Sequence, residues 1–313
     1  MINFRFHVVS IVAVFLALAI GVVFGSTILN ETLVDGLEQR LQDIDDKAER
    51  QREANERLKS DIERLDSYLR SNAAFAVDGR LSGLDLLVVA TPQVSEQVVA
   101  DLVALAGVAD ADTVVVARLD DSLALDDEAR VGDLASVLRS TRTGADELRA
   151  ELWTSIARRS AKDPATDPGL ADGDLLEQLA DAGFLTLEAG DDLETALAQF
   201  GGPSSLDVEI STTSAPLNDT DWLVGLADAA RRAELETLAG EVHERDAEAD
   251  RGVVLGELAV GDQSDVVATV DNLDEYQGRL SVVLAASELD DGVVGHYGFG
   301  AGATRSSPEL VAP

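Results

Sequence analysis

The sequence predicts an α/β protein in which an N-terminal transmembrane helix and a coiled-coil helix are followed by an open, mostly parallel α/β sheet domain. Three observations predict this fold class. An uncharged apolar run comes first, heptad spacing of apolar residues follows it, and short apolar runs then alternate with helical stretches. The predicted domains are a cytoplasmic tail at 1–7, a transmembrane helix at 8–29, a coiled-coil stalk at 30–75, an extracytoplasmic α/β domain at 80–290 and a Gly-rich C-terminal tail at 291–313.

The composition excludes several classes of function. The 313 residues carry 59 Asp and Glu against 24 Lys and Arg, a formal net charge of −35. Such a surface repels phosphate backbones, so we expect no nucleic-acid partner. The acidity is typical of a solvated surface adapted to salt or of a GC-rich genome, and a cation-attracting surface is the alternative. The absence of Cys excludes thiolate chemistry and Cys-ligated metal sites, and the only Met is Met1.

The first element is the apolar run at 8–29, VVSIVAVFLALAIGVVFGSTIL, which contains no charged residue. As a helix its 22 residues span about 33 Å, enough to cross a hydrocarbon core of about 30 Å. A cleaved secretory signal is the competing interpretation, but its apolar region is shorter and it ends at a small-x-small site, which residues 25–27 match poorly. Arg5 precedes the run, and Glu31 and Asp35 follow it. The positive-inside rule therefore predicts a single-pass protein of the cell membrane with a cytoplasmic N-terminus and the bulk of the chain outside.

Gly21 and Gly25 form a GxxxG pair within this run. The spacing lets two transmembrane backbones approach closely, which makes the pair a candidate for transmembrane packing. Glycine is also common in transmembrane helices without any such role.

The second element is the stalk, where apolar residues recur in alternating steps of three and four. With the a positions counted from Val34, nine of eleven a and d positions over five heptads are apolar. The predicted seam consists of Val34, Leu37, Leu41, Ile44, Ala48, Leu58, Ile62, Leu65 and Leu69. Gln51 and Asn55 interrupt the seam, and a buried Asn commonly fixes register and strand number. We expect a homo-oligomer or a coiled coil with another envelope protein; the alternative is an amphipathic helix folded back on its own domain.

The anchor and the stalk present different faces. At about 100° per residue, the Gly21 and Gly25 face points roughly 170° away from the face of Val34 and Leu37. One straight helix cannot offer both faces to the same partner. Either the helix breaks near residues 30–33, or the glycines face a different protein.

The third element, the α/β domain, begins with a strand–helix–strand pattern whose strands are almost continuously apolar, as in a buried parallel sheet. The strands are expected at 84–91, 113–119, 184–187, 206–212, 253–258 and 266–270. The helices are expected at 95–109, 126–139, 144–161, 174–182, from 220 onward, and at 275–289. Alternation of this kind favours an open sheet with helices on both faces.

We find no catalytic residues, no cofactor site and no metal site in recognisable context. Gly298-Phe-Gly300-Ala-Gly302 precedes no expected helix, so a glycine-rich turn explains it. His243-Glu244 begins like a zinc-protease motif, but Ala247 stands where the second His belongs. The chain has only three histidines. Acidic runs at 120–121, 126–128 and 191–194 offer oxygen ligands for a hard cation, but in so acidic a chain they are expected to be solvated faces. We therefore expect a protein that is not an enzyme.

Several segments resemble the MctB family, the actinobacterial relatives of mycobacterial copper transport protein B. They are the opening MINFRFHVVSIVAVFLALAIGVVFGSTIL, the stalk, the TVDN at 269–272, the GR at 278–279 and the GHYG at 295–298. The resemblance covers about a third of the chain, at both ends. It implies an envelope protein in copper efflux or copper homeostasis, with copper implied by the family alone.

Corynebacterial relatives resemble SteB, the membrane-bound partner of a cell-separation complex that acts on a peptidoglycan hydrolase. This resemblance implies the alternative function, a non-enzymatic coiled-coil scaffold in septation. The residues weigh against direct copper binding, because Cu(I) prefers thiolate and thioether ligands. A small-ligand sensor in the α/β domain is a third hypothesis.

Overall fold

The computed structural model describes residues 4–162, 173–190, 192–213, 220–244 and 250–309, without the side chains of 26–36, 38 and 220–222. The chain divides into two units, Met1–Leu65 and Asp66–Pro313. The first unit is the greater part of one helix, and the second is the α/β domain. Each unit is described by itself.

Helix α1, Phe4–Val77, is continuous through both units. It contains no proline, and exposed ion pairs at i,i+4 spacing support its charged part, such as Arg57 to Glu53 at 3.2 Å. The helix gives way to a turn in which Gly79 has a φ of +68°, a conformation that glycine adopts without strain. Of the two alternatives, the break near residues 30–33 is not found, because the backbone there is helical. The glycine pair and the stalk seam therefore lie on different faces of one helix.

The second unit is built on a seven-stranded sheet in the order β3-β2-β1-β4-β5-β6-β7. Its strands are β1 Asp85–Ala90, β2 Thr113–Leu119, β3 Leu185–Ala189, β4 Ser205–Thr212, β5 Glu236–Val242, β6 Val267–Val270 and β7 His296–Tyr297. Only β3 is antiparallel to its neighbour, and every other pairing is parallel. The predicted open, mostly parallel α/β sheet is confirmed.

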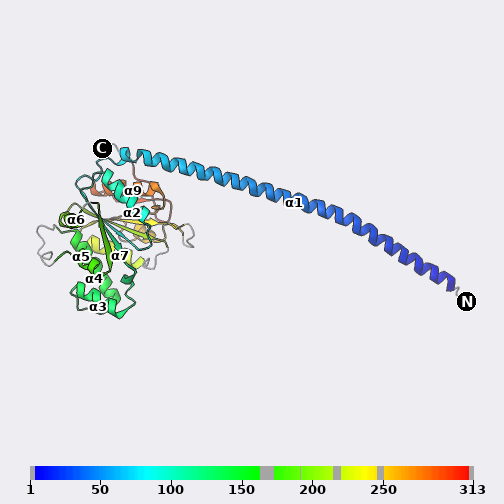
Figure 1. The fold of residues 1–313 in the computed structure, drawn as a ribbon, viewed down its shortest axis with the longest axis horizontal. Helices are drawn as coiled ribbons and strands as arrows, with labels where there is room; N and C mark the ends of the chain where they lie inside the picture. Colours follow the sequence, from blue (N-terminus) through cyan, green and yellow to red (C-terminus); the bar gives the residue numbers. More distant parts are fainter. Residues whose placement is uncertain (1–3, 163–172, 191, 214–219, 245–249, 310–313) are drawn as a thin grey trace. The chain divides into compact units, whose positions relative to one another are not determined.

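Helices cover both faces of the sheet. They are α2 Glu96–Val108, the 3₁₀ helix η1 Asp121–Ala124, α3 Glu128–Val137, α4 Ala145–Ser160, α5 Leu175–Asp181, α6 Leu193–Gln199, α7 Thr220–Arg232, α8 Gly256–Val260 and α9 Tyr276–Asp290. One apolar core joins the sheet to α2, α9 and the last turns of α1. The other joins it to the layer that contains α4, α5 and α7. Figure 1 shows α2 and α9 on one side of the sheet and α4, α5 and α7 on the other.

The prediction failed at one strand. Residues 253–258, expected as a strand, form a turn and the start of α8, and their apolar side chains Leu255 and Leu258 pack into the core from there. The strand between β4 and β6 is instead β5, which falls within the helical stretch expected from 220 onward. Its sequence ETLAGEV does not read as a buried strand because it contains the charged Glu241. Glu241 is nevertheless buried, and its carboxylate accepts hydrogen bonds from the backbone N–H groups of Gly252 and Val254 at 2.9 and 3.1 Å.

The segment expected as a Gly-rich tail also contains sheet structure. β7 pairs with β6 through Thr269 and Val270. The hydroxyl of Tyr297 donates to Glu288 on α9, and the carboxylate of Asp271 accepts from the backbone N–H groups of Phe299 and Gly300 at 2.9 and 2.8 Å. These contacts attach the glycine-rich loop to the sheet edge, so the loop has a structural explanation.

Candidate functional site

The apolar part of α1 is a candidate membrane anchor, and among the described residues it is the one helix that passes a test of length and composition. It comprises Phe4–Gly25, 22 residues with a mean hydropathy of 2.8, and none of it is buried. Apolar side chains such as Phe15 are exposed, which is unfavourable in water and favourable in lipid. A Cβ added at Gly21 or Gly25 would meet no atom within 4 Å. This face therefore has room for a close partner helix.

Six predicted seam residues form an apolar stripe along the first unit of α1, and each is 58–65% exposed. The stripe consists of Leu37, Leu41, Ile44, Leu58, Ile62 and Leu65. Ala48 lies at the expected step between them and is partly exposed, and the side chain of Val34 is outside the described part. A stripe of large apolar side chains at heptad spacing is the surface that another helix covers in a coiled coil.

Leu69, the last predicted seam residue, lies in a different environment. It is partly buried against the core that Ala73 and Val77 help to form. Arg70, one residue on, pairs with Asp66 at 3.0 Å and with Asp101 of α2 at 3.3 Å. The heptad pattern therefore continues directly into the packing of the α/β domain.

The motif residues at the C-terminal end gather around β6, α9 and β7. Gly278 packs so closely on the carbonyl of Asn272 that a Cβ there would overlap it. Arg279 lies 3.4 Å from the carboxylate of Asp101, and burial lowers the pKa of its guanidinium. These residues connect α9 to the sheet and to α2, so their role in the described structure is packing.

The three histidines do not converge. His7 lies in the apolar helix and is exposed. His296 has both ring nitrogens engaged, Nδ1 with the Thr269 hydroxyl at 3.0 Å and Nε2 with the Ser264 carbonyl at 3.1 Å. Burial lowers the pKa of His296, which favours the neutral ring. His243 Nδ1 is buried and has no hydrogen-bond partner within the part of the chain that the structure describes. Within the described ranges, no three His, Asp or Glu side chains are arranged to hold a metal ion.

Asp residues in the predicted acidic runs cap helices. Asp120 and Asp127 each accept a backbone hydrogen bond at 2.9 Å at the start of η1 and α3, and hydrogen bonds from Ser122 lower the pKa of Asp120. Asp192 accepts from the backbone of Thr195 at 3.1 Å at the start of α6; Asp191 lies outside the described residues. Side-chain caps of this kind satisfy helix N–H groups.

Sequence reasoning missed two buried carboxyl groups in the central strand β4. Asp207 and Glu209 alternate with Leu206, Val208 and Ile210, which belong to the core on the α2 and α9 side. Both acids therefore face the α4 and α7 layer and are fully buried, and among the described residues the carboxyl oxygens of Glu209 have no hydrogen-bond partner.

Desolvation raises the pKa of Asp207 to about 8, and the hydroxyl of Ser160 opposes the shift. Desolvation and the neighbouring Asp207 raise the pKa of Glu209 well above its usual range. Both groups are thus favoured in their neutral form. The alternation of apolar and acidic residues in LDVEIS was the signal for these buried acids. A central strand covered on both faces normally has a continuous run of apolar residues.

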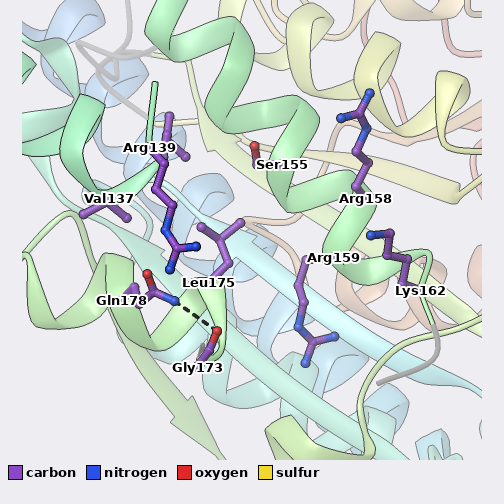
Figure 2. Close-up of a pocket in the computed structure, with 10 residues that line it drawn as sticks. Val137, Arg139, Ser155, Arg158, Arg159, Lys162, Gly173, Leu175 and Gln178 are labelled. Atoms are coloured by element: carbon purple, nitrogen blue, oxygen red, sulfur yellow. Dashed lines mark hydrogen bonds between the residues drawn. The ribbon is translucent and has the colours of Figure 1, made fainter. Parts of the chain in front are cut away.

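Sequence reasoning also missed a basic pocket, which Figure 2 shows at the ends of α3, α4 and α5. The cavity has a volume of about 340 Å³. Its lining consists of Val137, Leu138, Arg139, Ser155, Arg158, Arg159, Lys162, Gly173, Leu175 and Gln178. Among the lining residues that the structure describes, four are basic and none is acidic. The only sequence signal was the local run of Arg158, Arg159 and Lys162; Arg139 joins them only through the fold.

An N-terminal apolar helix consistent with a membrane anchor, an exposed heptad face and a mostly parallel α/β sheet domain define the class of this protein.

Comparison with known proteins gives the family. The model of the family described as "Copper transport outer membrane protein, MctB" matches residues 1–308. Proteins named copper transporter MctB from Mycobacterium bovis and Mycobacterium tuberculosis are 30% identical over 325 aligned positions, covering 97% of this chain and 98% of theirs. The Mycobacterium leprae protein of that name is 26% identical over 335 positions, with the same coverage.

The chain belongs to the MctB family. The relatives are named as transporters and not as enzymes. Their names make no reference to cell separation, so the septation alternative gains no support.

Proposed function

We propose that this protein acts in copper transport and copper homeostasis at the cell envelope, with copper as its substrate. The observation that carries the proposal is the match to a copper transport family over residues 1–308, which includes the apolar helix of a membrane protein. The family match spans anchor, stalk and domain together, so the proposal applies to the whole chain.

In this proposal α1 is a retained anchor in the cell membrane, with the N-terminus in the cytoplasm and the α/β domain outside. Arg5 before the apolar helix and the acidic residues after it support this orientation. Protease added to intact spheroplasts should remove the α/β domain. Protection of the domain, or recovery of the chain in an outer-membrane fraction, would contradict this placement.

The donor atoms restrict how copper could be handled. The soft ligands that Cu(I) prefers are almost absent, since the chain has no Cys and one Met. Of the two histidines outside the anchor, His296 has both nitrogens occupied. The one apolar helix found among the described residues encloses no pore by itself. Transport therefore requires several copies of this chain or a partner protein. The chain's own contribution is to assemble with them.

The exposed stripe on α1 supports such an assembly, and the neighbouring charges bear on its partner. Copies anchored in one membrane would pair in parallel and in register. Each g position of one helix would then face the following e position of the other. These contacts pair Lys47 with Arg52 and Asp61 with Asp66, which repel, and Arg40 with Asp45, which attract. Two of these three contacts are repulsive. The charges therefore favour a partner helix that is acidic opposite Lys47 and Arg52 over a second copy.

Gene deletion and complementation test the proposed function. Cells without the gene should grow poorly under copper stress, and the full chain should restore growth. A chain in which Leu58, Ile62 and Leu65 are all replaced by Gln should fail to restore growth, because half of the exposed stripe is lost while the α/β core is untouched. The matched control replaces exposed residues on another face, Glu56→Gln and Ser60→Gln. Normal growth of the deletion strain in copper would overturn the proposal.

A further inference from the structure

The last turns of α1 belong to two patterns at once. In the heptad counted from Val34, Leu69 and Ala76 are a positions that continue the seam of the exposed stripe. In the structure both are partly buried against the core on the α2 and α9 side, where Ala73 and Val77 complete the contact. A helix face can contact either the domain or another helix, but not both. The α/β domain therefore covers the end of the stalk seam.

Apolar packing holds this segment only weakly. Two of its four core residues are alanines, whose small side chains bury little apolar surface. The large side chains of the segment point the other way, since Tyr68 is 65% exposed and Phe75 is 93% exposed. Other contacts are therefore needed to fix these turns on the domain.

A charged cluster supplies these contacts, and all its members lie in the second unit. Asp101 of α2 lies between two arginines, 3.3 Å from Arg70 of α1 and 3.4 Å from Arg279 of α9. The side chain of Gln97 donates to its other carboxylate oxygen at 2.7 Å. The two guanidinium groups also lie 4.1 and 5.8 Å from the centre of the Tyr276 ring. We call Arg70, Asp101, Tyr276 and Arg279 the junction cluster.

Asp101 determines the balance of charge in the junction cluster. Its side chain is 12% exposed and that of Arg279 is 8% exposed, so solvent weakens their attraction little. Without this carboxylate, two guanidinium groups would lie beside one aromatic ring and repel each other. Arg70 is 42% exposed and also pairs with Asp66 at 3.0 Å, so its attraction to Asp101 is accessible to salt. The end of α1 is therefore attached by an interaction that can break without disrupting the α/β core.

We propose that the junction cluster is a releasable contact, which holds the last turns of α1 on the α/β domain and, when it opens, frees Leu69 and Ala76 to extend the exposed stripe. In the closed state, which the structure shows, the stripe ends at Leu65. Opening adds two a positions to the surface available to another helix, while the sheet and its helices stay folded. The contact regulates the stripe on which the assembly proposed above rests, but its test involves neither copper nor a partner.

Cysteine labelling tests the release, because the chain contains no Cys and one introduced thiol is a unique reporter. Ala73→Cys places the thiol in the contact between α1 and the domain, where the side chain is 4% exposed. In the full chain in detergent, a maleimide should label this thiol slowly. Arg70→Gln and Asp101→Asn should each increase the labelling rate about tenfold or more, because each removes the attraction between α1 and α2. Sodium chloride at about 1 M should increase the rate as well.

Two controls separate release from unfolding and from a general loss of charge. Ala157→Cys places a thiol in the core beneath α4, and the two cluster variants should not change its labelling rate. Asp133→Asn removes a carboxylate of α3 that is 57% exposed and pairs with an arginine outside the junction cluster. It should leave the labelling of Ala73→Cys unchanged.

Equal labelling of Ala73→Cys with and without the cluster variants would overturn the proposal. Parallel acceleration at Ala157→Cys in the Arg70→Gln background would also overturn it, because that result indicates unfolding of the whole domain. Acceleration by Asp133→Asn would show that the effect is not specific to the cluster. If Asp101→Asn does not fold, because it leaves buried Arg279 without its carboxylate, the result for the partly exposed Arg70 decides.

Discussion

The buried acid Asp207 should make the stability of the α/β domain fall as pH rises. Its pKa is raised from 3.8 to about 8 by burial in the central strand. Between these values the unfolded chain is ionised at this position and the folded chain is protonated, so the folded state holds one more proton. The free energy of unfolding therefore decreases by about 1.4 kcal/mol per pH unit from this group alone. The decrease begins near pH 4 and levels off above pH 8.

Asp207→Asn removes the titration while keeping the size and shape of the side chain. At pH 8 the variant should be more stable than the wild type by several kcal/mol, with about 6 kcal/mol as the upper limit over the whole interval. Near pH 4 the advantage should disappear. Glu209→Gln should act in the same direction, because burial raises that pKa as well.

Urea unfolding of the full chain in detergent, followed by fluorescence from pH 4.5 to 8.5, measures the difference. Trp153 is a suitable reporter because it is buried in the core formed with α4. The control Asp262→Asn changes an exposed carboxyl and should follow the wild type. Parallel stability curves for Asp207→Asn and wild type across this pH range would refute the reasoning.

Three further predictions concern packing and assembly. Gly278→Ala should destabilise the domain by about 3 kcal/mol in thermal unfolding, because the new methyl group overlaps the carbonyl of Asn272; Gly107→Ala, where the Cβ meets nothing within 4 Å, should not destabilise it. Arg159→Met should cost about 3 kcal/mol in urea unfolding, since it leaves the partly buried Asp174 without its cation; an unchanged midpoint would contradict this role. Lys47→Glu should strengthen parallel self-association by about 0.5 kcal/mol per contact with Arg52, measured by sedimentation, and no change would argue against in-register pairing.

The sequence predicted the elements whose side chains follow a simple period. The apolar run of α1, its heptads, and the continuous apolar strands β1 and β2 each repeat a pattern that their environment dictates. The strand β5 was missed because Glu241 is buried and satisfied by backbone N–H groups, which no periodicity reveals. Leu69 continues the heptad but packs in the domain, since a seam and a core face have the same spacing.

The basic pocket lay beyond prediction for a different reason. It assembles the ends of three helices, and Arg139 enters it through a left-handed backbone conformation that its sequence neighbours do not indicate. Such sites depend on how the helices end, which is the least regular part of a helix. The buried acids Asp207 and Glu209 of β4 were indicated only by their alternation with apolar residues, which the prediction did not use.

Cell-associated copper, measured by mass spectrometry after a copper load, tests the proposed role most directly. The strain without this gene should accumulate more copper than its parent, and the full chain should restore the parental level. A chain that lacks the apolar helix Phe4–Gly25 should not restore it, because the proposed role requires the anchor. Equal copper content in the deletion and parental strains would contradict the account.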